Sequence, residues 1–141
     1  MNTIMLNSRD DLTQATIKIF GAFAPDIPLV IHDYMATFVF GYRYKGFAIR
    51  EIEDGHCYYL PLHIERISMI TPIDYNLLDV SPDALGILLT LHCYSLCLNG
   101  NINQARAYAL EHMDAMKQKR KYLFDYALRT LPSECLVMML K

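Results

Sequence analysis

The sequence has little excess charge of either sign. Its 141 residues include 13 Lys and Arg against 15 Asp and Glu, a formal net charge of −2 at pH 7. A protein that holds nucleic acid mainly through its phosphates needs a basic excess, and a protein that imitates DNA needs a dense excess of carboxylates. Both of these strongly electrostatic classes are therefore disfavoured.

Signals for export, membrane insertion and repetition are also missing. No basic segment followed by an apolar stretch opens the chain, so we expect a cytoplasmic protein. The most apolar run, Ala84 to Leu98, is interrupted by polar residues and is shorter than the roughly 20 residues that span a bilayer, which predicts a buried helix. Four cysteines are present, and a reducing cytosol predicts free thiols. Without internal repeats, residues 1–141 are expected to form a single domain.

The first third of the chain predicts helices. A hydrophobic share of 53% is enough to close a core. Ser8, followed three residues later by an acid, predicts the start of a helix over Arg9–Phe20. Pro28 suits the first turn of a second helix, whose apolar stripe continues at helical spacing to Tyr42. The segment Ala36–Tyr44 is rich in Thr, Phe, Val and Tyr, so a strand remains the alternative there.

The middle of the chain predicts strands. Phe47–Ile52 and His56–Leu60 flank a tight turn in which Gly55 supplies a positive φ, the pattern of a β-hairpin. Ile64–Thr71 is a third candidate strand, closed by Pro72, which cannot donate to a central ladder.

Helices dominate the last part of the sequence. Ser81-Pro82-Asp83 combines a capping hydroxyl, a proline at the first helical position and a carboxylate at the positive end of the helix dipole. It predicts a helix over about 82–98 that Asn99-Gly100 ends, and this helix is apolar on nearly all sides.

A second long helix follows the central one. Asn103 is its predicted cap and Pro132 its end, with a short helix over Ser133–Leu140 after it. Strands grouped between helices, without βαβ alternation, predict an α+β fold: a small antiparallel sheet covered by several helices around the central helix 82–98.

Residues that could carry chemistry are scattered. Cys93 and Cys97 share a helix face, but small cysteines in an apolar helix are more often core residues than zinc ligands, and further ligands would have to come from His56 and Cys57. Histidines adjacent or close to acids in sequence occur at His32-Asp33, His63-x-Glu65 and Glu111-His112. Neither an H-E-x-x-H motif nor a phosphate-binding glycine loop is present, so we predict no catalytic residue, no metal site and no cofactor.

The densest local charge lies on the predicted long helix. We predict a partner-binding surface there, because complementary charge at an interface gives specificity and speed of encounter. Its candidate residues are Lys117, Lys119, Arg120, Lys121, Asp125 and Arg129. A solvated helix face is the alternative interpretation, and contact with nucleic-acid phosphates is a third.

The order of several short motifs goes further than composition. An aromatic hairpin ends in an apolar residue and proline, a serine-capped apolar helix follows, and an aromatic helix leads to the C-terminus. These motifs are Phe47 to Pro61 with Tyr58-Tyr59-Leu60-Pro61, Val80 to Ile87 with Thr90-Leu91, and Tyr122-Leu123-Phe124-Asp125-Tyr126-Ala127. Over about Phe47 to Leu140 the chain resembles the antirestriction proteins of the ArdB/KlcA type, although it has Phe124 where that family usually carries arginine.

The resemblance implies a function. It implies a non-enzymatic protein of a plasmid, prophage or genomic island that relieves type I restriction-modification of incoming DNA without imitating DNA. The implied partner is the type I enzyme or a component that controls it, and no membrane partner is expected. The alternative is a small nucleic-acid-associated regulator of a mobile element, using the same basic helix on phosphates. An enzyme would require a His or Cys brought against a carboxylate in a pocket.

Overall fold

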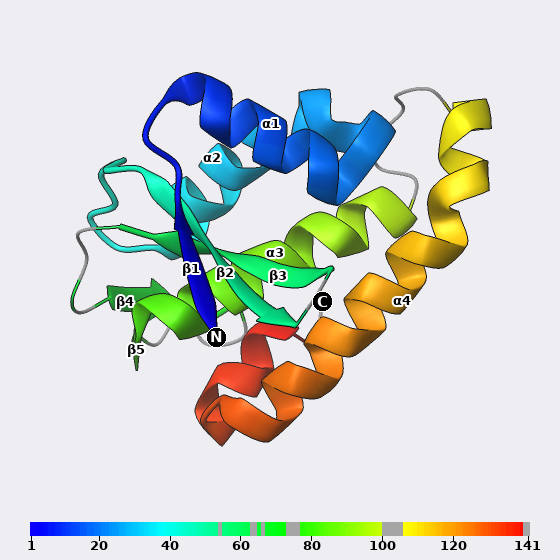
Figure 1. Ribbon diagram of the computed structural model, residues 1–141. Helices are drawn as coiled ribbons and strands as arrows, with labels where there is room; N and C mark the ends of the chain where they lie inside the picture. The colour runs from blue at the N-terminus through cyan, green and yellow to red at the C-terminus, as the bar shows by residue number, and fades with distance from the viewer. Residues whose placement is uncertain (54, 63–64, 66, 73–76, 100–105, 140–141) are drawn as a thin grey trace.

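The computed structural model describes residues 1–53, 55–62, 65, 67–72, 77–99 and 106–139, and of residues 106–112 the backbone alone. Figure 1 shows the described elements as an α+β arrangement. Its helical elements are α1 (Arg9–Phe20), the 3-10 helix η1 (Gly21–Asp26), α2 (Ile27–Phe38), α3 (Pro82–Leu98), α4 (Arg106–Thr130) and the 3-10 helix η2 (Ser133–Met139). Its strands are β1 (Asn2–Met5), β2 (Phe47–Glu53), β3 (His56–Pro61), β4 (Ile67–Ile70) and β5 (Leu77–Val80).

The larger sheet has three antiparallel strands in the order β1-β2-β3. Strands β2 and β3 form the predicted hairpin, and Gly55 in its turn adopts a φ of +80°. Register shifts between Glu51 and Glu53, an irregularity of the bulge type at the hairpin end. On the other side of β2, Ile4 of β1 lies opposite Ile49, so the N-terminal strand joins a hairpin more than forty residues away.

The smaller sheet pairs β4 with β5. An isolated antiparallel bridge between Val39 and Met69 connects the segment after α2 to β4. The predicted third strand is therefore present, with described bounds 67–70, while positions 64 and 66 lie outside the described residues.

Helices α1 and α3 both pack against the hairpin, and two tyrosines of β3 show where. The Tyr59 hydroxyl hydrogen bonds with Thr16 of α1 at 2.8 Å, whereas the hydroxyl of its neighbour Tyr58 donates to Asp83 of α3 at 2.6 Å. Consecutive strand residues point to opposite faces, so these two bonds place α1 and the first turn of α3 on opposite faces of the hairpin, while the middle of α3 lies along the edge of β3, where Tyr59 N donates to Thr90. Most of α3 is buried, and α4 runs beside it toward η2 (Figure 1).

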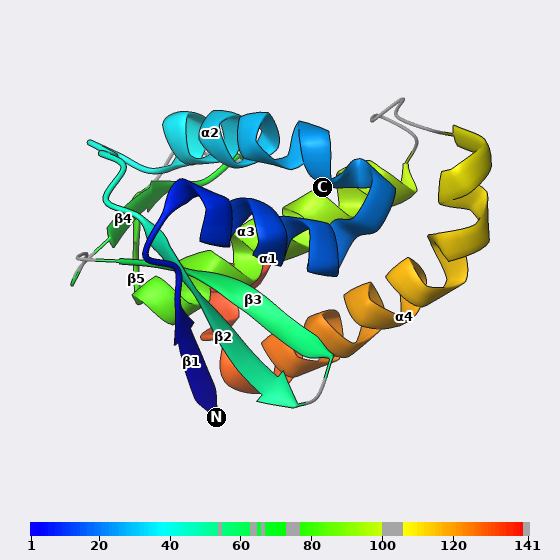
Figure 2. The same ribbon diagram turned by 45° about the horizontal axis from the view of Figure 1, so that its top comes forward.

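Helices α1 and α2 are separated by the 3-10 helix η1. The helical run Arg9–Phe38 is long and apolar enough to cross a membrane by length and composition alone. However, η1, with Pro25 inside it, divides this run, and Figure 2 shows α1 and α2 lying side by side. Ile27, Ile31 and Met35 of α2 are buried in the core, and α2 packs against α3, which is the behaviour of a core helix in a globular domain.

The predicted α+β class is confirmed, with the apolar helix α3 at its centre. Ser81 caps that helix by accepting a hydrogen bond from Ala84 N at 3.0 Å, as expected from the Ser-Pro-Asp signal. Asn99 ends it, while Gly100 and the predicted cap Asn103 lie outside the described residues. Helix α4 stops at Thr130, two residues before Pro132.

One helix end was predicted wrongly, and two strands were missed. The second helix ends at Phe38 rather than near Tyr42, because Val39 turns to extended backbone and bridges β4. The short C-terminal helix predicted from Ser133 is present as a 3-10 helix over Ser133–Met139, and position 140 lies outside the described residues. Strands β1 and β5 were not predicted, since four residues give too short a stretch for alternation to be visible.

Candidate functional site

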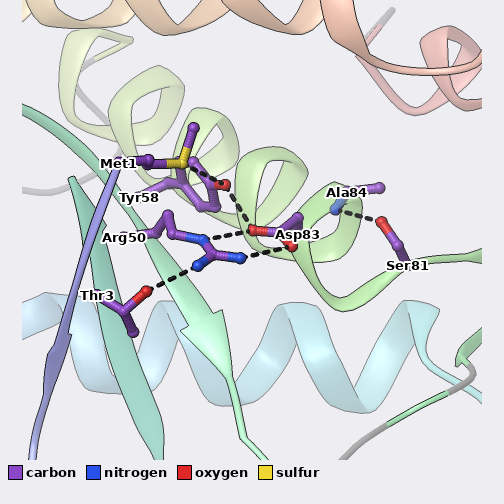
Figure 3. Close-up of polar contacts among 7 residues, drawn as sticks. All are labelled: Met1, Thr3, Arg50, Tyr58, Ser81, Asp83 and Ala84. Atoms are coloured by element: carbon purple, nitrogen blue, oxygen red, sulfur yellow. Dashed lines mark hydrogen bonds and ion pairs between the residues drawn. The ribbon is translucent and has the colours of Figure 1, made fainter. Parts of the chain in front are cut away.

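A polar network joins the start of α3 to the sheet (Figure 3). Arg50 of β2 meets Asp83 with two hydrogen bonds, Nε to Oδ1 at 3.0 Å and Nη2 to Oδ2 at 3.1 Å. The hydroxyl of Tyr58 on β3 donates to the same Oδ1 at 2.6 Å, and Arg50 Nη1 donates to the Thr3 hydroxyl of β1 at 2.7 Å. All three strands of the larger sheet are thereby connected to the first turn of one helix.

The hydrogen bonds of this network fix the protonation states of Asp83 and Tyr58. Burial opposes ionisation of Asp83, but hydrogen bonds from Arg50 and Tyr58 outweigh it and lower the pKa of the carboxyl. Burial and the bond to Asp83 raise the pKa of Tyr58, so its hydroxyl remains a donor at neutral pH. The charged groups use their hydrogen-bonding capacity on one another, and the network is structural.

A hollow lies on the other face of the sheet. It has a volume of about 440 Å³ and lies between β1, α1, the hairpin and α4. Ile4, Ile19 and Ile49 supply part of its apolar wall. Its lining residues with polar or charged side chains are Asp11, Gln14, Lys18, Glu51, Cys57, Tyr94 and Lys119.

Cys57 is a half-buried thiol in the wall of this cavity. Burial raises its pKa; Lys119 and Lys18 act in the opposite direction, and Glu51 adds to the increase. The thiol is therefore protonated at neutral pH and is no activated nucleophile. Lys18, Glu51 and Lys119, the three charged groups that act on its pKa, line the same cavity.

The other cysteines are buried. Cys93 and Cys97, the pair considered as metal ligands, lie on α3, and burial raises the pKa of Cys97 to about 12. Among the described residues no group of three or more His, Cys, Asp or Glu converges as a metal site would require. His56 stacks on Tyr122 with ring centroids 3.8 Å apart, whereas His63 and the side chain of His112 lie outside the described residues.

The structure divides the predicted partner-binding residues between two sides of α4. Lys119 and Arg120 turn toward the body of the protein. Lys119 Nζ donates to the Ile19 carbonyl at the end of α1 at 3.2 Å, and so satisfies one of the carbonyls that a helix end leaves open. Arg120 Nε donates to Ser95 Oγ at 3.2 Å, and its guanidinium lies 5.7 Å from the Phe124 ring centroid. These two side chains fasten α4 to α1 and α3.

The remaining four candidates follow one another at every fourth position of α4. Residues spaced by four lie on one side of a helix, and all four are exposed. We call them the outer stripe: Lys117, Lys121, Asp125 and Arg129. Lys121 pairs with Asp125 at 3.3 Å, and Arg129 Nε donates to the Asp125 carbonyl at 3.4 Å. Within the described part of the chain, these polar contacts lie inside α4, and the four exposed side chains face solvent.

Sequence reasoning found Lys119 but missed the cavity that Lys119 borders. The other lining groups come from β1, α1 and the hairpin, and the sequence gives no signal that these segments meet. Cys57 was considered only as a distant metal ligand. Lys18 and Glu51 attracted no attention, because an isolated charge on an element surface is ordinary.

Comparison with known proteins defines the class of the fold. No family model matches the chain, and no curated protein matches it in sequence. Its described architecture, however, is that of a solved structure that it matches over 99% of its own length and 94% of the other chain, with a TM-score of 0.70 at 14% sequence identity.

That solved structure is of the KlcA and ArdB proteins. It was described as showing a novel fold and antirestriction activity against type I DNA restriction systems in vivo but not in vitro. The predicted resemblance is thus confirmed at the level of the fold, which this chain shares.

Proposed function

We propose that this protein relieves type I restriction of incoming DNA and does so without enzymatic activity. The observation that carries the proposal is the shared fold over almost the whole of both chains. The order of the hairpin, Ser-Pro-Asp helix and aromatic helix supports the same conclusion from the sequence. In this proposal the protein acts in the cytoplasm of a host that carries a plasmid, prophage or genomic island.

The proposed working surface is the outer stripe of α4. Two lysines, an aspartate and an arginine face solvent there, whereas Lys119 and Arg120 serve the fold. Exposed charges of both signs provide complementarity to a protein surface, and they govern specificity and encounter rate more than affinity. The partner is the type I enzyme or a cellular component that controls it. Activity in vivo but not in vitro, described for the KlcA and ArdB proteins, favours the cellular component.

The alternative of a DNA-binding regulator loses support from the same geometry. Two of the four basic residues in the run 117–121 bond to Ile19 and Ser95 and are not directed at a phosphate backbone. Asp125 then offsets one of the cations that remain. A net charge of −2 supplies no compensating field.

The test is the plating efficiency of unmodified phage on cells that carry a type I restriction system and express the protein. A matched strain without that system is the control for general effects on phage growth. We expect recovery of plating only in the restricting strain. No recovery, with soluble and folded protein in the cells, would refute the proposal, and salt-sensitive binding to duplex DNA would then favour the regulator.

Direct and indirect action are separated by a second measurement. Purified protein is added to purified type I enzyme with unmodified DNA, and cleavage is followed over time. Relief in cells together with unchanged cleavage in the purified reaction would assign the effect to a cellular component. Inhibition in the purified reaction would assign it to the enzyme itself.

A further inference from the structure

We propose that the cavity between α1 and the larger sheet binds a small amphipathic monoanion, an alkyl chain that ends in a carboxylate. The site is independent of the outer stripe and of the proposed antirestriction activity. Its volume of about 440 Å³ is within the range of small-molecule sites, roughly 300–1,000 Å³.

The apolar part of the cavity suits a flexible hydrocarbon chain. Ile4 from β1, Ile19 from α1, Ile49 from β2 and Tyr94 from α3 line it. These four side chains come from four different elements, so the wall is formed by the tertiary fold and does not depend on a single loop. Apolar walls with a few convergent polar groups are typical of ligand sites.

The charged part favours a single negative charge. Lys18, Lys119 and Glu51 line the cavity together with Cys57, and all three act on the pKa of its thiol, so two cations and one anion lie in this part of the cavity. Their sum is one positive charge, which one carboxylate neutralises. Lys119 uses one hydrogen bond on the Ile19 carbonyl, and an ammonium group has three N–H donors, so it can still bind a carboxylate.

The other acid of the lining is engaged at the opposite end of α1. Asp11 lies in the first turn, where its Oδ2 accepts from Asn7 N at 3.0 Å. Lys18 lies in the last turn, seven residues or about 10 Å along the helix axis. The cavity is therefore polarised along α1, and the carboxylate belongs at the end with Lys18 and Lys119.

Cys57 provides a reporter within the site. The other three cysteines are buried, so alkylation of the folded protein by iodoacetamide proceeds first at this half-buried thiol. The probe is octanoate, with 1-octanol as the uncharged control of equal chain length and acetate as the charged control without a chain. We expect octanoate to slow alkylation of Cys57 at lower concentration than either control. Equal protection by octanoate and octanol, or none by octanoate, would overturn the proposal.

Three variants test the charge argument, and their expected effects on octanoate binding differ in direction. For each variant we compare the octanoate concentration that halves the rate of Cys57 alkylation relative to the same variant without octanoate. Lys18→Glu should raise this concentration about threefold to fivefold, in the range of a partly exposed ion pair. Glu51→Gln should lower it, because the repelling carboxylate is gone. The matched control Lys117→Glu, on the exposed outer stripe, should leave it unchanged.

The direction in which each variant changes the protective octanoate concentration tests whether the anion site is local. A change in Lys117→Glu as large as that in Lys18→Glu, or weaker protection in Glu51→Gln, would refute a local anion site. Plating efficiency does not enter these measurements, so their failure and the failure of the proposed function are distinguishable.

Discussion

A β-carbon added to Gly86 would lie 1.8 Å from the carbonyl oxygen of Tyr59. The two residues belong to α3 and β3, and no side chain separates the helix from the strand at this point. The obstacle is backbone, which cannot rotate away as a flexible side chain would. Glycine is therefore required at position 86 because α3 and the backbone of β3 lie too close together for a side chain. The backbone of Gly86 itself does not adopt a left-handed conformation.

Gly86→Ala should destabilise the protein by about 3 kcal/mol, at the upper end of overpacking effects. In an open helix the same change would stabilise by about 1 kcal/mol, because alanine has the higher helix propensity. The sign of the effect thus tests the contact, and urea unfolding measures it. Gln118→Ala on the exposed side of α4 is the control for propensity, and equal effects in the two variants would contradict the packing argument.

Thr90 lies one turn after Gly86 and completes the attachment of α3 to β3. Its hydroxyl accepts from Tyr59 N at 3.0 Å and donates to the Gly86 carbonyl at 2.8 Å. Thr90→Val keeps the shape but leaves the buried Tyr59 N–H without this acceptor, at a cost of about 1–3 kcal/mol.

A threonine on α1 serves as the matched control for that substitution. Thr13 also donates to the carbonyl four residues before it, Arg9, at 3.0 Å, but it is exposed. Thr13→Val should change the free energy of unfolding by less than about 0.5 kcal/mol. A loss as large as that in Thr90→Val would show that the hydroxyl-to-carbonyl bond matters rather than the contact with β3.

These contacts explain why the sequence predicted the fold better than the site. Ser81 caps α3, Asp83 pairs with Arg50, and Gly86 and Thr90 fit against β3. The Ser-Pro-Asp helix motif that suggested a family therefore consists mostly of residues that pack α3 against the larger sheet. Caps and hairpin turns are local in sequence and could be predicted.

The features that could not be predicted depend on contacts between segments far apart in the sequence. Strand β1 forms because Ile4 and its neighbours pair with β2. Four residues alone carry no pattern from which this pairing could be predicted. The cavity depends on β1 in turn. Similarly, the charge run on α4 could be seen in the sequence, but the bonds of Lys119 to Ile19 and of Arg120 to Ser95 that divide it could not.

The Arg50–Asp83 pair predicts a loss of stability in acid. The pKa of Asp83 is lowered below its ordinary value of 3.8, so the folded state holds the ionised carboxylate more strongly than the unfolded chain does. The stabilisation is present above the unfolded pKa and is lost as pH falls through the folded pKa. Urea unfolding from about pH 6 to pH 2 should show it.

Asp83→Asn removes this titration. The variant should be less stable than the original protein at neutral pH, and the difference should shrink as the pH falls. Asp125→Asn is the matched control, since its exposed pair with Lys121 contributes little. A difference between Asp83→Asn and the original protein that stays constant down to pH 2 would contradict the proposed linkage.

The two sides of α4 should separate activity from stability. Charge reversal of Lys117 and Lys121 on the outer stripe should reduce the recovery of phage plating at least tenfold. The urea midpoint should stay nearly unchanged, because both side chains are exposed and the ion pair of Lys121 lies within α4. Reversal of Lys119 and Arg120 should instead lower the urea midpoint, because the bonds to α1 and α3 are lost. Both double variants carry the same change in net charge, so a general electrostatic effect would act on both alike. Full plating recovery in the variant at Lys117 and Lys121 would exclude those two lysines from the working surface.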